Sequence, residues 1–136
     1  MTDTSTETRS VAMEREFPYP PERIWRALTQ PHLIEEWLMK NDFQPRIGHR
    51  FELRADWGSV ACEVLEVEPN RTLVYSWEAN GLESMVTWTL APSATGTILR
   101  MEQSGFSTGQ EQFYQGAKAG WPRFLSSLEQ VVARID

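Results

Sequence analysis

The sequence predicts an α+β domain in which a curved antiparallel sheet of about six strands wraps around one long C-terminal helix. Three observations predict this class. Segments with alternating apolar and polar residues follow one another through the middle of the chain, turn-forming residues separate them, and apolar residues recur at helical spacing near the C-terminus. Because a single helix cannot cover a flat sheet of this width, we expect the sheet to curl around it.

The N-terminal part predicts one strand followed by two short helices. Residues 10–17 alternate loosely, as a strand does. Pro20 and Pro21 suit the start of a helix, because proline is favoured in the first helical turn. Pro31 ends that helix and can open a second one, since proline interrupts the helical hydrogen-bond ladder but is tolerated at its start. The second helix carries Trp37 on its apolar side.

Five further strands are expected to follow as an antiparallel meander whose apolar faces turn toward the long helix. Pro69-Asn70 and Asn80-Gly81 mark tight turns, and the second pair is a strong hairpin signal. A shift in the alternation at residues 65–67 predicts a β-bulge. The five segments are residues 49–55, 60–68, 72–77, 85–90 and 97–103.

The long helix is predicted over residues 110–135, and it contains residues that weaken a helix. Each glycine costs a helix interior about 1 kcal/mol relative to alanine, and an interior proline costs about 3 kcal/mol. Gly116, Gly120 and Pro122 nevertheless lie near its middle. We expect a bend near Pro122, and we expect Ala117 and Gly120 to leave space on the inward side. We interpret the small residues and the bend as leaving a gap between the helix and the sheet in which a molecule can bind.

Composition limits the classes of function. The chain of 136 residues has a net charge of −6, which argues against a nucleic-acid partner because phosphate backbones need a basic face. A single cysteine, Cys62, excludes an internal disulfide and a thiolate-rich metal site. We see no secretion signal and no apolar run near the ~18 residues of a membrane span, so we expect a cytoplasmic protein without a membrane partner. Residues 1–9 should form a flexible N-terminus, and residues 10–136 a single domain.

Five motifs follow one another in a distinctive order: PPERIWRALTQPHLIEEWL, EVLEVEPNRTLVYSW, VTWTL, GTILRMEQSGF, and GW followed by FLSSL. In this order they resemble the SRPBCC superfamily (START-like, helix-grip, polyketide-cyclase-like). They are most similar to the branch named after the activator of the heat-shock-protein-90 ATPase. The resemblance covers the chain from about residue 10 to its end. It implies a curved sheet and a long helix that enclose a hydrophobic cavity, in a superfamily whose members bind lipids, polyketides and hormones and include cyclases and dehydratases.

The sequence predicts no catalytic residue, no metal site and no cofactor. His32 and His49 lack the paired spacing of metal ligands, and no nucleophile motif is found. Many members of the family that the chain resembles have a histidine where this chain has Gln103, and glutamine cannot act as a general base at neutral pH. Tyr75 and Gln103, with Asp56 near the rim of the sheet, are the polar groups that could orient a ligand.

The aromatic content is the main functional signal, with six Trp, six Phe and three Tyr. Aromatic residues on inward faces either fill a solid core or line a cavity, and the residues alone leave both open. The small residues of the long helix and the hollow fold implied by the resemblance favour a cavity. The expected ligand-binding residues are Trp37, Phe51, Tyr75, Trp77, Trp88, Met101, Gln103, Phe113, Gly120, Trp121 and Phe124.

Three functions compete on this basis. The leading hypothesis is the binding of a small hydrophobic or aromatic ligand between the sheet and the long helix. The first alternative is an enzyme, such as a cyclase or dehydratase, that acts on such a ligand. The second is a co-chaperone-like regulator of a heat-shock-protein-90 ATPase, which ranks last because we expect one short domain without the additional domain of the eukaryotic activators. The identity of the ligand and the formation of a homodimer stay open.

Overall fold

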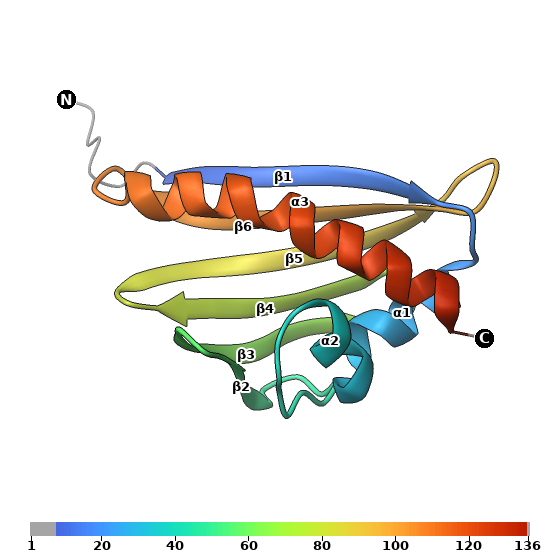
Figure 1. The fold of residues 1–136 in the computed structure, drawn as a ribbon, viewed down its shortest axis with the longest axis horizontal. Coiled ribbons are helices and arrows are strands. Elements are labelled where there is room, and N and C mark those ends of the chain that lie inside the picture. Colours follow the sequence, from blue (N-terminus) through green and yellow to red (C-terminus); the bar gives the residue numbers. More distant parts are fainter. Residues whose placement is uncertain (1–7, 136) are drawn as a thin grey trace.

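The computed structural model describes residues 8–135, and its elements follow the predicted order (Figure 1). The first strand begins at Thr8, earlier than expected, because Thr8 and Arg9 already pair with the last strand of the sheet. The rest of the predicted flexible N-terminus, residues 1–7, lies outside the described range. The bounds are β1 (Thr8–Phe17), α1 (Pro21–Thr29), α2 (Pro31–Trp37), β2 (Arg50–Ala55), β3 (Gly58–Glu68), β4 (Thr72–Ala79), β5 (Leu82–Pro92), β6 (Thr97–Ser107) and α3 (Glu111–Arg134).

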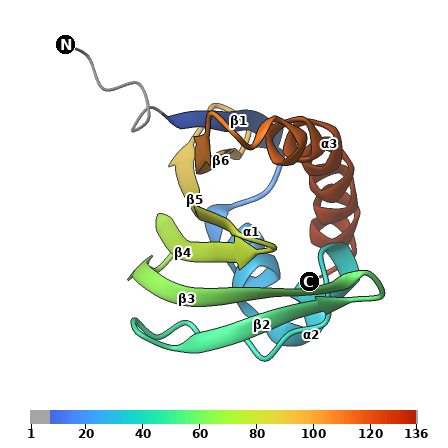
Figure 2. The ribbon, with the colours of Figure 1, turned by 90° about the vertical axis from the view of Figure 1, so that its left-hand side faces the viewer.

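The six strands form one antiparallel sheet in the order β1-β6-β5-β4-β3-β2. Strands β2 to β6 are neighbours in the order of the sequence, which is the predicted meander, and β1 adds to it beside β6. Figure 2 shows the sheet curling around the side that carries the helices. The predicted class, a curved antiparallel sheet wrapped on a long C-terminal helix, is therefore confirmed.

The turn and bulge signals of the sequence are also confirmed. Asn80 and Gly81 have φ angles of 53° and 87° and connect β4 to β5, as the two central residues of a tight hairpin turn require. Asn70, with a φ of 67°, turns the chain between β3 and β4. The pairing of β3 with β4 shifts between Val64 and Glu66, at the predicted bulge.

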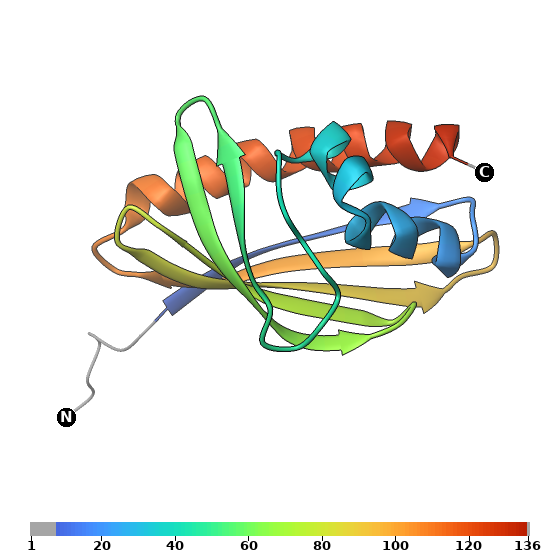
Figure 3. The same ribbon diagram turned by 90° about the horizontal axis from the view of Figure 1, so that it is seen from below.

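The two halves of α3 have different surroundings. From Trp121 onwards the inward residues other than the half-buried Phe124 are buried, and α1 and α2 pack against this second half (Figure 3). Before Trp121 the inward residues Phe113, Ala117 and Gly120 are only half-buried. The helix is continuous through Pro122, and Figure 2 shows its first turns end-on and its remainder running downwards, so it bends as expected. The filled core therefore lies under the part of α3 that begins at Leu125.

Hydrogen bonds from α1 hold the C-terminal end of α3 in place. Arg23 donates from Nε to the carbonyl of Val132 at 2.8 Å and from Nη2 to that of Ala133 at 3.1 Å. These carbonyls have no helical partner, and a cation near a helix C-terminus is also favoured by the helix dipole. The anchored second half sets the position of the first half relative to the sheet.

Candidate functional site

A cleft of about 230 Å³ lies between the first half of α3 and the sheet. The floor comes from β4, β5 and β6, and one wall comes from α3. Its lining combines six aromatic side chains with small apolar residues and three amides. The lining residues are Trp57, Trp77, Ala79, Asn80, Leu82, Gln103, Phe106, Gln112, Phe113, Gly116, Ala117, Gly120, Trp121 and Phe124.

Glycines of α3 create part of this space. A Cβ atom built on Gly116 would meet nothing within 4 Å, and one built on Gly120 would meet only the ring edge of Phe124, at 4.0 Å. Close packing against the sheet therefore does not explain the glycines. Ala117 lies on the same side of the helix and lines the cleft as well. The glycines that weaken the helix therefore lie on the face of α3 beside which no protein atoms fill the space.

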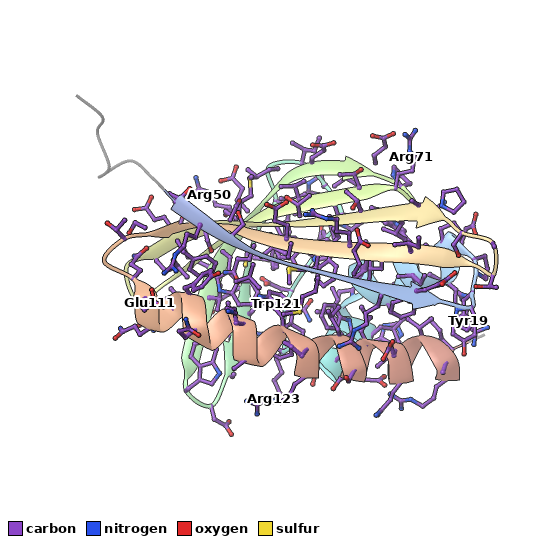
Figure 4. The ribbon with its side chains drawn as sticks, turned by 90° about the horizontal axis from the view of Figure 1, so that it is seen from above. Tyr19, Arg50, Arg71, Glu111, Trp121 and Arg123 are labelled. Carbon is purple, nitrogen blue, oxygen red and sulfur yellow. The ribbon has the colours of Figure 1, made fainter. Side chains whose placement is uncertain are left out.

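Trp121 forms the inner end of the cleft. Figure 4 shows its side chain pointing from α3 toward the sheet, whereas Arg123 points away from it. The ring centroid of Trp121 lies 5.5 Å from that of Trp77, 5.5 Å from that of Phe124 and 5.7 Å from that of Trp88. Trp121 thus contacts both Trp77, which lines the cleft, and Trp88, which belongs to the filled core, and it lies at the boundary between them.

Trp57 lies at the outer edge of the cleft. It belongs to the short turn between β2 and β3, and its residue surface is 61% exposed. Figure 3 shows this hairpin reaching across the first half of α3. An indole at this edge presents a large apolar face next to the opening. Trp57 was absent from the expected site, although a tryptophan in a turn sequence (DWGS) is an unusual signal that could have drawn attention to it.

A chain of hydrogen bonds crosses the floor of the cleft. Trp121 donates from Nε1 to Oε1 of Gln103 at 2.8 Å, and Gln103 donates from Nε2 to the hydroxyl of Ser84 at 2.9 Å. The Ser84 hydroxyl donates to the carbonyl of Trp77 at 2.8 Å. Gln103 is only 2% exposed. These bonds connect β4, β5 and β6 to α3 and fix the orientation of the Trp121 indole, whereas Trp77 takes part only through its backbone carbonyl.

The structure brings six of the eleven expected residues to the cleft: Trp77, Gln103, Phe113, Gly120, Trp121 and Phe124. The other five lie outside it and belong to the filled core, because α1, α2 and the segment before β2 cover that half of the sheet. There Trp37 packs edge-on to Trp88 at 5.6 Å, and Phe51 packs against Tyr75 at 5.4 Å. These five are Trp37, Phe51, Tyr75, Trp88 and Met101.

The remaining polar candidates do not line the cleft. His32 is exposed on α2, and Nε2 of His49 lies 2.9 Å from the backbone carbonyl of Asp42. Asp56 is exposed in the β2–β3 turn. Within residues 8–135 no group of three or more His, Cys, Asp or Glu side chains could hold a metal ion. In the same range no helix is long and apolar enough to cross a membrane.

Tyr75 is a core residue whose ionisation should limit stability at high pH. Burial raises the pKa of its hydroxyl strongly, although the N–H of Trp88, which donates to that hydroxyl at 3.0 Å, opposes the shift. Below the pKa of an unfolded tyrosine, about 10, the hydroxyl is neutral in both the folded and the unfolded state. As the pH rises above this value the unfolded state ionises first, so the free energy of unfolding falls. We expect the urea midpoint of the wild type to fall more steeply between about pH 9 and pH 11 than that of Tyr75→Phe. Equal slopes for the two proteins would contradict this.

The comparisons with known proteins agree with the fold. Residues 18–133 match the family model described as activator of Hsp90 ATPase homolog 1-like protein. None of the curated proteins compared with the chain matches it.

Several solved structures match almost the whole chain. Protein MLL2253 from Mesorhizobium loti is 58% identical with a TM-score of 0.91, over 94% of this chain and 99% of that one. CalU16 from Micromonospora echinospora is 28% identical with a TM-score of 0.81, over 92% of this chain and 74% of its own. DynU16, described as a protein of the dynemicin biosynthetic locus, is 26% identical with a TM-score of 0.83, over 92% of this chain and 47% of its own.

Proposed function

The chain belongs to the activator of Hsp90 ATPase homolog 1-like family of the SRPBCC superfamily, and from this premise we propose that it binds a small uncharged aromatic or apolar molecule. The binding site is the cleft between the first half of α3 and strands β4 to β6. One observation carries the proposal: the glycine face of α3 lies opposite aromatic walls, with unfilled space between them.

The lining defines the chemistry of the ligand. None of the described residues that line the cleft is charged, so an ionised ligand would lose its hydration without gaining a counter-charge. Six aromatic side chains offer faces and edges for stacking. The three amides, on Asn80, Gln103 and Gln112, can hydrogen-bond to neutral polar groups. A neutral molecule with an aromatic body therefore fits better than a fatty-acid anion.

The volume limits the size of the ligand. Pockets for drug-sized molecules enclose about 300–1,000 Å³, whereas an apolar cavity of about 150 Å³ holds benzene. The cleft, at about 230 Å³, lies between these values. We expect a ligand with one or two fused rings to be enclosed, and a longer molecule to project past Trp57.

No specific observation favours the two alternative functions. An enzyme of the cyclase or dehydratase type needs a group that transfers protons, and the polar groups of the cleft lining are amides and indole N–H groups, which do not ionise near neutral pH. A co-chaperone needs a contiguous exposed surface. The large exposed apolar side chains of residues 8–135 are Ile47, Trp57, Leu65 and Met85, which come from four different segments.

A pair of leucine substitutions on one helix tests the proposal. Gly120→Leu places a side chain directly into the cleft, whereas Ala119→Leu adds the same side chain on the exposed side of α3. We expect naphthalene derivatives to quench or shift the tryptophan emission of the wild type and of Ala119→Leu. The emission of Gly120→Leu should stay unchanged. Thermal unfolding of both variants controls for folding.

The proposal fails if no neutral aromatic in a broad panel changes the emission or the melting temperature of the wild type. It also fails if Gly120→Leu binds as tightly as Ala119→Leu, because the ligand would then occupy another place. Anionic fatty acids serve as the contrasting ligand class, and we expect them to bind more weakly than neutral aromatics of similar size.

A further inference from the structure

The hydrogen bonds around Gln103 allow only one orientation of its side-chain amide. The indole Nε1–H of Trp121 can only donate, so the atom that faces it at 2.8 Å must be the amide oxygen. The amide nitrogen therefore faces the Ser84 hydroxyl at 2.9 Å. Ser84 in turn uses its own proton on the carbonyl of Trp77 at 2.8 Å, so its oxygen is free to accept. Neighbours on both sides specify the same orientation.

This arrangement leaves one donor of Gln103 without a protein acceptor. A primary amide carries two N–H groups, and the hydrogen bonds within residues 8–135 use one of them, for Ser84. Gln103 is buried, with only 2% of its surface exposed, and it lines the cleft. A buried N–H without an acceptor is rarer and more costly than a carbonyl with a spare lone pair. One N–H of the Gln103 amide is therefore free to donate to a bound molecule.

The geometry points to Gln103 as the residue that selects the ligand, by donating its second amide N–H to an acceptor oxygen on a neutral aromatic molecule. This inference rests on the proposed function and adds a polar group to the ligand. A ketone, ester or ether oxygen can fill the position. A hydrocarbon of the same shape leaves the N–H unpaired. Stacking between Trp77 and the glycine face of α3 would hold the ring, and Gln103 would fix its direction.

Two probes of nearly the same shape test the inference on the unmodified protein. Acetylnaphthalene carries a carbonyl oxygen, and isopropenylnaphthalene replaces that oxygen with a methylene group. We expect the ketone to bind about three- to tenfold more tightly, the contribution of one net hydrogen bond. With an isotope-labelled carbonyl, infrared spectroscopy should show the C=O stretch of the bound ketone at lower wavenumber than in an apolar solvent. A purely structural Gln103 would not cause this shift.

Two variants assign the shift to Gln103. Gln103→Met keeps the length of the side chain but removes the donor, so the carbonyl stretch should return to its position in apolar solvent. Ser84→Ala disturbs the same hydrogen-bond chain and keeps the amide, so the shift should persist. If Gln103→Met does not fold, the two probes and the infrared band of the wild type still decide.

The outcomes separate this inference from the proposed function. If both probes bind equally and the bound carbonyl is unshifted, Gln103 does not select the ligand, while binding in the cleft stands. If the shift persists in Gln103→Met, another donor is responsible and the inference is wrong. If neither probe binds although hydrocarbons of the aromatic panel do, the inference is wrong and the proposed function stands; if nothing in the panel binds, both are wrong.

Discussion

Gly96→Ala should destabilise the domain by more than about 3 kcal/mol, because a methyl group there would overlap with backbone atoms. A Cβ atom on Gly96 would lie 2.1 Å from the carbonyl oxygen of Phe17 and 2.6 Å from the amide nitrogen of Tyr19. Both are backbone atoms, so no side-chain rotation can relieve the contact. The hydroxyl of the next residue, Thr97, donates to the carbonyl of Tyr19 at 2.8 Å and holds the two segments together.

Urea unfolding checks this expectation against Gly109→Ala. A Cβ atom on Gly109 would meet nothing within 4 Å, so this control should unfold within about 0.5 kcal/mol of the wild type. A domain of this size typically has a free energy of unfolding of about 5–15 kcal/mol. Gly96→Ala should therefore unfold at a much lower urea concentration or fail to fold. An unchanged midpoint for Gly96→Ala would show that the β5–β6 turn does not press against the end of β1.

Trp88→Ala should cost about 3–5 kcal/mol, the usual loss when a large buried aromatic residue is truncated. Trp88 is 0% exposed, packs against Trp37 and Trp121 at 5.6 Å and 5.7 Å, and donates its indole N–H to Tyr75. The substitution would leave a cavity in the filled core and the Tyr75 hydroxyl without its donor.

Trp57→Ala is the matched control for this prediction. The same truncation at the exposed edge of the cleft should change the free energy of unfolding by less than about 0.5 kcal/mol. Urea midpoints of the two variants, measured together, compare the filled and open parts of the interior. Similar losses for both would contradict the division of the interior at Trp121.

The sequence predicted the fold because its signals are local. Strands with one face toward a core alternate with period two, and helices that pack on one side repeat every three or four residues. Asn80-Gly81 specifies a tight hairpin through φ angles that few other residue pairs adopt easily. Pro21 and Pro31 begin α1 and α2 because their missing N–H groups are not needed there.

The boundary between the core and the cleft could not be predicted in the same way. Trp77 and Trp88 alternate on inward faces with the same pattern, yet one lines the cleft and the other is enclosed by protein. The difference arises because α1 and α2 cover only part of the sheet, which is a tertiary property. Trp57 reaches the cleft because the β2–β3 hairpin extends past its neighbours. The partners of Gln103 come from β5 and α3, far away in the sequence.

Gly120 was the most informative residue of the sequence. Its cost to the helix was visible without a structure, and its position on the inward side followed from helical geometry. The structure adds that the space beside it is unfilled and that Gly116 extends the same bare face.

A crystal structure of the protein with acetylnaphthalene bound tests the central claim most directly. We predict that the naphthalene ring occupies the cleft, with one face toward Gly116 and Gly120 and the other side bounded by Trp77 and Trp121. A ligand found elsewhere, or a cleft closed by movement of Trp57 or Phe124 with no ligand inside, would contradict the claim that this space is a binding site.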